Sequence, residues 1–125
     1  MRNIVRAGIG AVVAVAVLAT GLASAQAAGA LAIGTCAAYG FAYDFPSSQA
    51  AQAAAMKKCG PSCKNIVTAK KGCAALAVDG HKPCGPNGYA SASKLGAAQN
   101  TALKQCYQYG GKDCVIRAFM CDVKG

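Results

Sequence analysis

The residues that could support catalysis are few and lie around one turn. His81 is the only histidine of the chain, and it stands in the segment DGHKP that begins at Asp79. With Ser91 or Ser93 as the nucleophile, His81 and Asp79 would complete a serine–histidine–acid triad. Neither serine lies in a Gly-x-Ser-x-Gly segment, and Ser93 is placed to cap a helix. We therefore expect no enzymatic activity and keep a hydrolase as a minor alternative.

The carboxylates and the glycine-rich turn also lack a catalytic pattern. The chain has no glutamate, and its four aspartates are Asp44, Asp79, Asp113 and Asp122. Their spacing does not indicate the paired acid and base of a glycoside hydrolase. The glycines at 80, 85 and 88 are not followed by the Gly-Lys-Ser/Thr of a phosphate-binding loop. We expect no cofactor.

Cysteine is the most informative residue type in the chain. Zinc binding is one interpretation, but Cys59 and Cys63 are farther apart than the usual zinc-ligand pair, and only one histidine is available. A redox site at the same pair would lie at the end of a helix, whereas reactive thiolates are favoured at helix N-termini. An even number of cysteines in an exported chain predicts disulfides instead, so we expect no metal. The eight are Cys36, Cys59, Cys63, Cys73, Cys84, Cys106, Cys114 and Cys121.

Residues 1–27 have the composition of a secretory signal peptide. Arg2 and Arg6 precede an apolar run from Ala7 to Leu22, and both ASA and AQA before residue 28 match a small-x-small cleavage site. An uncleaved membrane anchor is the alternative, but the run is short and rich in glycine and alanine. We predict a single mature domain of residues 28–125, secreted or periplasmic, with no transmembrane segment after cleavage.

The predicted mature domain is strongly basic. The chain has 13 basic and 4 acidic residues, and removal of Arg2 and Arg6 leaves 11 basic residues and a net charge of +7. Such a surface attracts polyanions, although scattered lysines that only hydrate the surface are the alternative. No aromatic residues interleave the lysines, so nucleic acid is not an expected partner. The candidate binding surface comprises the turn residues His81 and Lys82 and the paired lysines Lys57, Lys58, Lys70 and Lys71.

The chain from Ala30 to Cys121 is predicted to contain two copies of a β-β-α-β unit, about residues 30–72 and 73–121. Serines precede both Ala-rich helices and are predicted to cap them. Alanines four and eight residues before Cys59 and Cys106 place small side chains on one face of each helix. The expected elements are strands 30–33, 40–45 and 65–69 around helix 49–58, then strands 75–78, 88–92 and 115–120 around helix 94–107.

The duplication favours one disulfide pairing among the 105 that eight cysteines permit. Within each copy, the cysteine that ends the helix would join the one that opens the next strand. The remaining cysteines would pair at equivalent positions across a pseudo-twofold axis. Exchanged pairings between the copies stay open. The favoured pairs are Cys59–Cys63, Cys106–Cys114, Cys36–Cys84 and Cys73–Cys121.

Several short motifs carry a family resemblance over about residues 30–121. They are Gly40-Phe-Ala-Tyr, the Ala-rich helix into Cys59, Cys63 with Ile66-Val67, Cys73-Ala-Ala-Leu-Ala-Val78, Gly88-Tyr-Ala-Ser, and Cys106 to Cys121 through Cys114-Val-Ile. The chain resembles a bacterial family catalogued as domain of unknown function 4189. This resemblance implies a small exported protein, as found in mycobacteria and other host-associated bacteria, and supplies no catalytic residues.

The chain departs from that family in two respects. It adds Cys36 and Cys84, and it lacks the tryptophans that are common in the hairpin strands, with Phe41, Tyr43 and Tyr89 nearby instead. The loss of tryptophan weakens the case for an aromatic binding surface.

The predicted protein is an exported, disulfide-stapled α+β domain made of two pseudo-symmetric repeats with antiparallel sheet. The expected function is binding without catalysis, as a secreted or periplasmic envelope component. The partner would be an extracytoplasmic protein or an anionic envelope polymer. A protein-docking inhibitor or a host-directed effector is the alternative.

Overall fold

The computed structural model describes residues 27–122, so the predicted signal peptide lies outside the described residues except for Ala27. Among the described residues, no helix has the length and apolar character needed to cross a bilayer. The elements follow one another as β1 (Ala28–Ile33), β2 (Tyr39–Phe45), α1 (Ser48–Cys59), β3 (Asn65–Ala69), β4 (Gly72–Asp79), β5 (Asn87–Ala92), α2 (Leu95–Gln108) and β6 (Cys114–Asp122).

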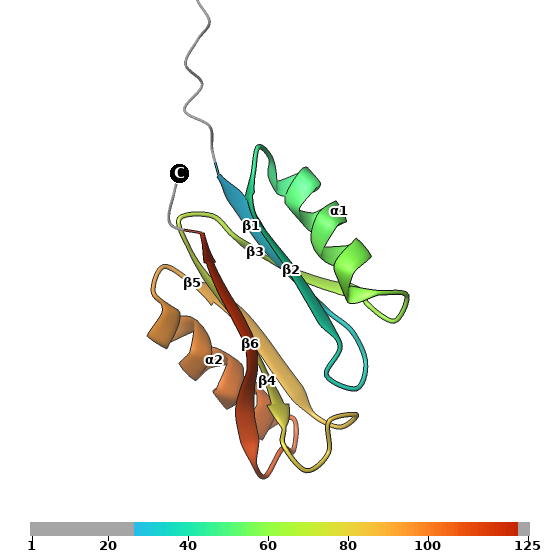
Figure 1. Cartoon of the computed structure of the whole chain (residues 1–125). Coiled ribbons are helices and arrows are strands. Elements are labelled where there is room, and N and C mark those ends of the chain that lie inside the picture. The colour runs from blue at the N-terminus through green and yellow to red at the C-terminus, as the bar shows by residue number, and fades with distance from the viewer. Residues whose placement is uncertain (1–26, 123–125) are drawn as a thin grey trace, which may run out of the picture.

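Each half of the chain forms one three-stranded antiparallel sheet with one helix (Figure 1). The strand order is β2-β1-β3 in the first sheet and β5-β4-β6 in the second. In both sheets the first strand of the unit lies at the centre, and its two successors flank it. The identical connectivity confirms the predicted pair of β-β-α-β units.

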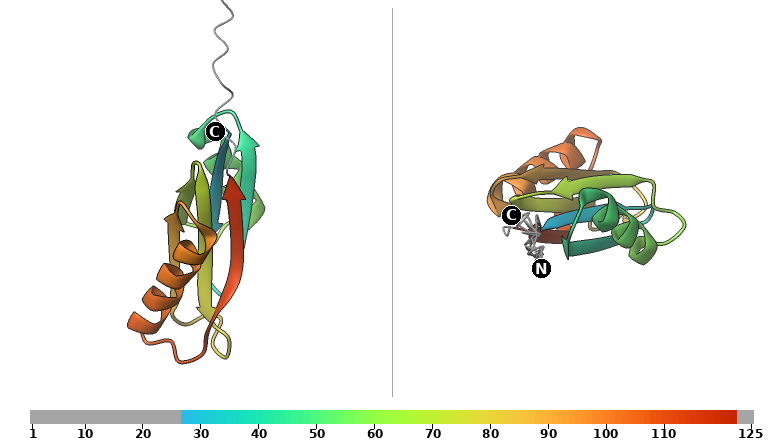
Figure 2. Two further views of the ribbon diagram at one scale, coloured as in Figure 1. Left: turned by 90° about the vertical axis from the view of Figure 1, so that its left-hand side faces the viewer. Right: turned by 90° about the horizontal axis from the view of Figure 1, so that it is seen from above.

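The two sheets pack face to face, and the helices cover their outer faces (Figure 2). Side chains alternate between the two faces of a strand, so each central strand contributes to two cores. Leu31 and Ile33 of β1 meet Leu76 and Val78 of β4 between the sheets. The intervening alanines of these strands face the helices. The result is four layers, with a branched aliphatic core in the middle and alanine-rich cores on either side.

Small residues bring each helix close to its sheet. Ala51 and Ala55 of α1, like Ala98 and Ala102 of α2, are fully buried. A Cβ atom added to Gly40 of β2 would come within 2.5 Å of backbone atoms of α1. The equivalent Gly88 of β5 lies equally close to the backbone of α2. These alanines and glycines therefore set the distance between helix and strand.

The two helices begin differently, although a serine cap was predicted for both. Ser47 caps α1 as predicted, and its hydroxyl accepts a hydrogen bond from the backbone N–H of Ala50. The prediction that Ser93 caps the second helix is wrong, because the residue at the cap position is Lys94. Its backbone carbonyl accepts the N–H of Ala98, but a lysine side chain cannot accept a hydrogen bond from the helix.

The structure contains four disulfides, in the pairing that the repeat favours. Cys59–Cys63 joins the end of α1 to the turn before β3, and Cys106–Cys114 joins α2 to the first residue of β6. Cys36–Cys84 links the two units through their loops. Cys73–Cys121, however, joins β4 to its neighbour β6. The expectation that it would bridge equivalent positions of the two copies is wrong, since Cys73 begins the central strand of the second unit.

Candidate functional site

Asp79 holds two loops in place and is not exposed for catalysis. Its side chain is buried at the end of β4, where Oδ1 accepts the backbone N–H groups of His81 and Lys82 and Oδ2 accepts that of Lys112. Hydrogen bonds from the backbone N–H groups of Lys112 and His81 hold the pKa of the Asp79 carboxyl below its usual value. The carboxylate thus ties two loops to the strand end.

The serine–histidine–acid arrangement considered from the sequence is not assembled. Ser91 pairs with Ala74 in the sheet, five positions along β4 from Asp79, which corresponds to roughly 16 Å of extended chain. His81 instead meets Asp113, with Nε2 and Oδ2 3.2 Å apart and both side chains largely exposed. Among residues 27–122 there is also no group of three metal-ligating side chains placed to hold an ion.

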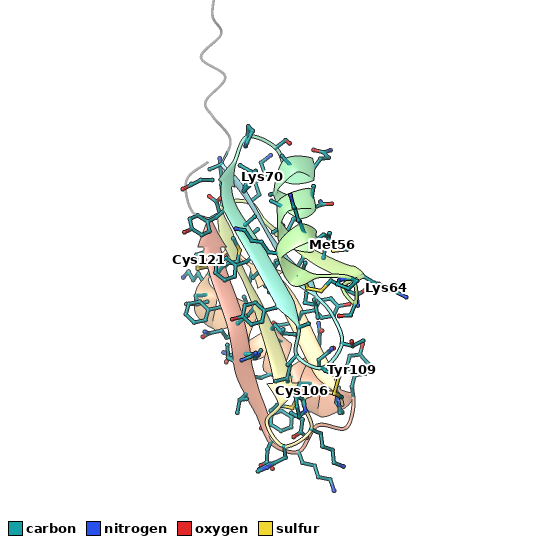
Figure 3. The ribbon with its side chains drawn as sticks, turned by 45° about the vertical axis from the view of Figure 1, so that its right-hand side comes forward. Met56, Lys64, Lys70, Cys106, Tyr109 and Cys121 are labelled. Atoms are coloured by element: carbon teal, nitrogen blue, oxygen red, sulfur yellow. A yellow bond between two sulfur atoms is a disulfide. The ribbon has the colours of Figure 1, made fainter. Side chains whose placement is uncertain are left out.

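The predicted binding residues are distributed over the molecule. Lys57 and Lys58 lie in the last turn of α1, whereas Lys70 and Lys71 form the turn between β3 and β4 at the opposite end of the first sheet. Figure 3 shows this separation through Lys64 and Lys70, which flank the two ends of β3.

The predicted turn residues lie at a third place. His81 and Lys82 line a hollow of about 300 Å³ beside Asp79, Lys112 and Asp113. The structure therefore does not gather the six predicted binding residues into one patch.

A different hollow lies where the two sheets meet. The edge strands β2 and β6 contact each other across the sandwich (Figure 1). A hollow of about 370 Å³ opens at this seam. Its lining combines aromatic rings, aliphatic groups, one amide and one guanidinium, from Tyr39, Phe41, Gln99, Ile116, Arg117, Ala118 and Phe119. We call this hollow the seam groove.

An aromatic ladder along β2 forms one wall of the seam groove. Tyr39 and Phe41 have ring centroids 6.4 Å apart with an interplanar angle of 4°. Tyr43 continues the ladder, 6.2 Å from Phe41, and keeps 55% of its surface exposed. The alternation Tyr-x-Phe-x-Tyr is the sequence signal for this ladder, although the absence of tryptophan weakens the case for an aromatic surface when the sequence is taken alone.

Arg117 of β6 brings a positive charge to the same wall. Its guanidinium carbon lies 5.2 Å from the centroid of the Tyr39 ring, within the range of a cation–π interaction. Its Nε donates to the carbonyl oxygen of Ala37 at 3.3 Å. No carboxylate of the described residues forms a salt bridge with it. Within the part of the chain that the structure describes, the bond to Ala37 is the one hydrogen bond of the Arg117 side chain.

The comparisons with known proteins identify a family and a fold. The family model described as Domain of unknown function (DUF4189) matches residues 28–121, which confirms the resemblance drawn from the sequence motifs. No curated protein matches the chain. Among solved structures, the NMR structure of Rv1813c from Mycobacterium tuberculosis is similar, with a TM-score of 0.59 and 24% identity over 78% of this chain and 76% of that chain. At this identity the likeness concerns the fold.

Proposed function

We propose a binding function for this protein, which belongs to the DUF4189 family. The protein is exported to the periplasm or the medium, where it holds an anionic polymer of the cell envelope without catalysing a reaction. The four disulfides support an oxidising compartment, and the signal-like composition of residues 1–27 supports export.

The observation that carries this proposal is a basic surface that is not neutralised. Every lysine of the described residues is exposed, as is Arg117. The single ion pair among residues 27–122 joins His81 to Asp113 and involves no lysine or arginine. Buried Asp79 and Asp122 accept backbone N–H groups instead of pairing with cations. The positive charge is therefore available to an external polyanion.

The rigid framework supports binding rather than chemistry. The fold keeps Ser91 away from His81 and its aspartate neighbours, so the nucleophile and base that a hydrolase would need are not brought together. It holds exposed cations and a solvent-open groove on strands and helices that are cross-linked by disulfides. Little conformational freedom would be lost when such a surface takes up a polymer.

The direct test is a titration of the oxidised protein with polyglucuronate and with dextran of matched length. We expect polyglucuronate to bind at about 0.05 M salt and to bind at least about tenfold more weakly at about 0.5 M salt, where screening acts within a few Å. Dextran should not bind. Equal binding of both polymers, or no binding of polyglucuronate, would contradict the proposal, and so would the release of new reducing ends.

A further inference from the structure

The seam groove differs from its counterpart in the other half of the molecule. Because the units are duplicated, the contact between β2 and β6 has an equivalent between β3 and β5. When the two repeats are aligned by Gly40 and Gly88, the ladder residues of the first repeat correspond to three residues of the second. Tyr39 corresponds to Asn87, Phe41 to Tyr89, and Tyr43 to Ser91. One seam has therefore kept three aromatic rings, and the other has polar residues at the first and third positions.

A β-bulge supplies the charge at the same seam. Ala77 pairs with Ile116 and Leu76 pairs with Ala118, so Arg117 is an extra residue on β6. In the first unit, the equivalent strands pair without an insertion, with Ala32 opposite Ile66 and Leu31 opposite Val67. Bulges reorient a side chain and are frequent at binding sites. The inserted residue here points its guanidinium at the Tyr39 ring.

From these two asymmetries we infer that the seam groove binds a carboxylate-bearing sugar unit of an envelope polymer. The inference rests on the proposed function and names the ligand class of its specific site. The site joins an aromatic ladder from the first unit to an arginine from the second, so it requires the duplicated fold.

The chemistry of the lining matches such a ligand. One face of a pyranose ring presents C–H groups, which pack against the electron-rich face of an aromatic ring. Phe119, 52% exposed, and the ladder rings provide apolar surface of this kind. The terminal nitrogens of Arg117 can donate two parallel hydrogen bonds to a carboxylate. The amide of Gln99 on α2 can donate to and accept from sugar hydroxyls.

The geometry disfavours an extended peptide at the same place. A peptide would add to a sheet edge by regular backbone hydrogen bonds. At the β2 edge, the ammonium group of Lys58 already donates to the carbonyl oxygen of Phe41. At the β6 edge, the bulge at Arg117 breaks the regular spacing of the strand. Side-chain stacking and a charged hydrogen bond are the interactions that remain.

The test is a calorimetric and NMR titration with three probes. The first probe is a tetrasaccharide of alternating glucuronic acid and N-acetylglucosamine, and the second is the uncharged tetramer of N-acetylglucosamine. The third is a short single-stranded oligothymidylate, which also offers stacking and negative charge. The protein is purified from an exporting host with its disulfides intact. We expect the acidic tetrasaccharide to bind most tightly and to shift the resonances of Tyr39, Arg117 and Phe119.

Matched variants distinguish specific binding in the seam groove from general attraction to the positive charge of the protein. Arg117→Gln and Phe119→Ala should each weaken the acidic tetrasaccharide about tenfold, the size expected when a charged hydrogen bond or a buried stacking contact is lost. Lys70→Gln removes the same charge from an exposed turn outside the groove and should change the affinity less than about twofold. The altered side chains are exposed, and the NMR spectrum of each variant verifies its fold.

Each remaining outcome overturns the inference in a distinguishable way. Equal weakening by Arg117→Gln and Lys70→Gln would mean that charge alone binds the sugar. Tighter binding of the uncharged tetramer or of the oligothymidylate would assign the groove to another ligand. If polyglucuronate binds but the acidic tetrasaccharide does not, the proposed function stands and the groove inference falls. If neither binds, both fall.

Discussion

At the scale of single residues, Asp79 shows how a buried charge is kept in a small domain. Only 4% of its surface is exposed, yet its carboxylate accepts three backbone N–H groups. Burial of a charge is tolerated when hydrogen bonds replace the lost water. These bonds anchor two segments at the end of β4. One is the β4–β5 loop, which carries His81 and Lys82, and the other is the segment before β6, which carries Lys112.

The hydrogen bonds of Asp79 predict a pH-dependent contribution to stability. Since the pKa of this carboxyl is lowered in the folded state, its contribution is complete above the unfolded-state value of about 3.9. It is lost as the pH falls through the lower folded-state pKa. We therefore expect Asp79→Asn to lower the thermal unfolding midpoint at pH 7 and to approach wild type progressively as the pH falls below about 4.

The control for this prediction is Asp113→Asn, which removes an exposed carboxylate from the surface pair with His81. Surface pairs contribute little, so this variant should unfold close to wild type at pH 7. A deficit of Asp79→Asn that stays constant down to pH 2 would show that its charge is not what anchors the loops.

At the scale of elements, close contact between helix and sheet depends on glycine and alanine. Gly88 lies against the backbone of α2, where an added Cβ would come within 2.6 Å of the Cys106 nitrogen. Gly96, in the first turn of the same helix, has open space around it. A glycine-to-alanine substitution therefore adds a methyl group against a packed backbone at position 88 and into open space at position 96.

We expect Gly88→Ala to destabilise the domain by about 1–3 kcal/mol, because α2 must move away from β5. Gly96→Ala should stabilise it by about 0.5 kcal/mol, since alanine loses less backbone entropy in a helix. Denaturant unfolding of both variants under oxidising conditions measures the difference. A Gly88→Ala variant as stable as wild type would show that the helix is free to shift on its sheet.

The sequence predicted elements well where periodicity alone decides them. Alternating strands, Ala-rich helices and the duplicated cysteines were sufficient to predict both units and the order of their elements, whereas the strand order within each sheet comes from the structure. The second helix was predicted to start at Lys94 after a Ser93 cap, because serine is a favoured cap residue. In the structure α2 starts one residue later, at Leu95, and the residue with the extended cap conformation is Lys94. The bulge at Arg117 could not be predicted, since it exists only in the register between β4 and β6.

At the scale of the whole molecule, the candidate site was the part least visible in the sequence. The paired lysines were expected to form one surface, but helix α1 and strand β3 carry them to opposite ends of a sheet. The seam groove combines residues about 80 positions apart, as the hydrogen bond from Arg117 to Ala37 illustrates. Only the packing of one sheet on the other brings such residues together.

We propose that the exposed basic surface of an exported, cross-linked scaffold holds an acidic envelope polymer. The most direct test of this proposal is capture from an envelope extract of the producing organism on the immobilised oxidised protein, eluted by a salt gradient. We predict that acidic carbohydrate elutes below about 0.5 M salt, where exposed charges are already screened. A discrete protein that stays bound above this concentration, without acidic carbohydrate, would overturn the polymer-binding function and indicate a protein-docking inhibitor or effector.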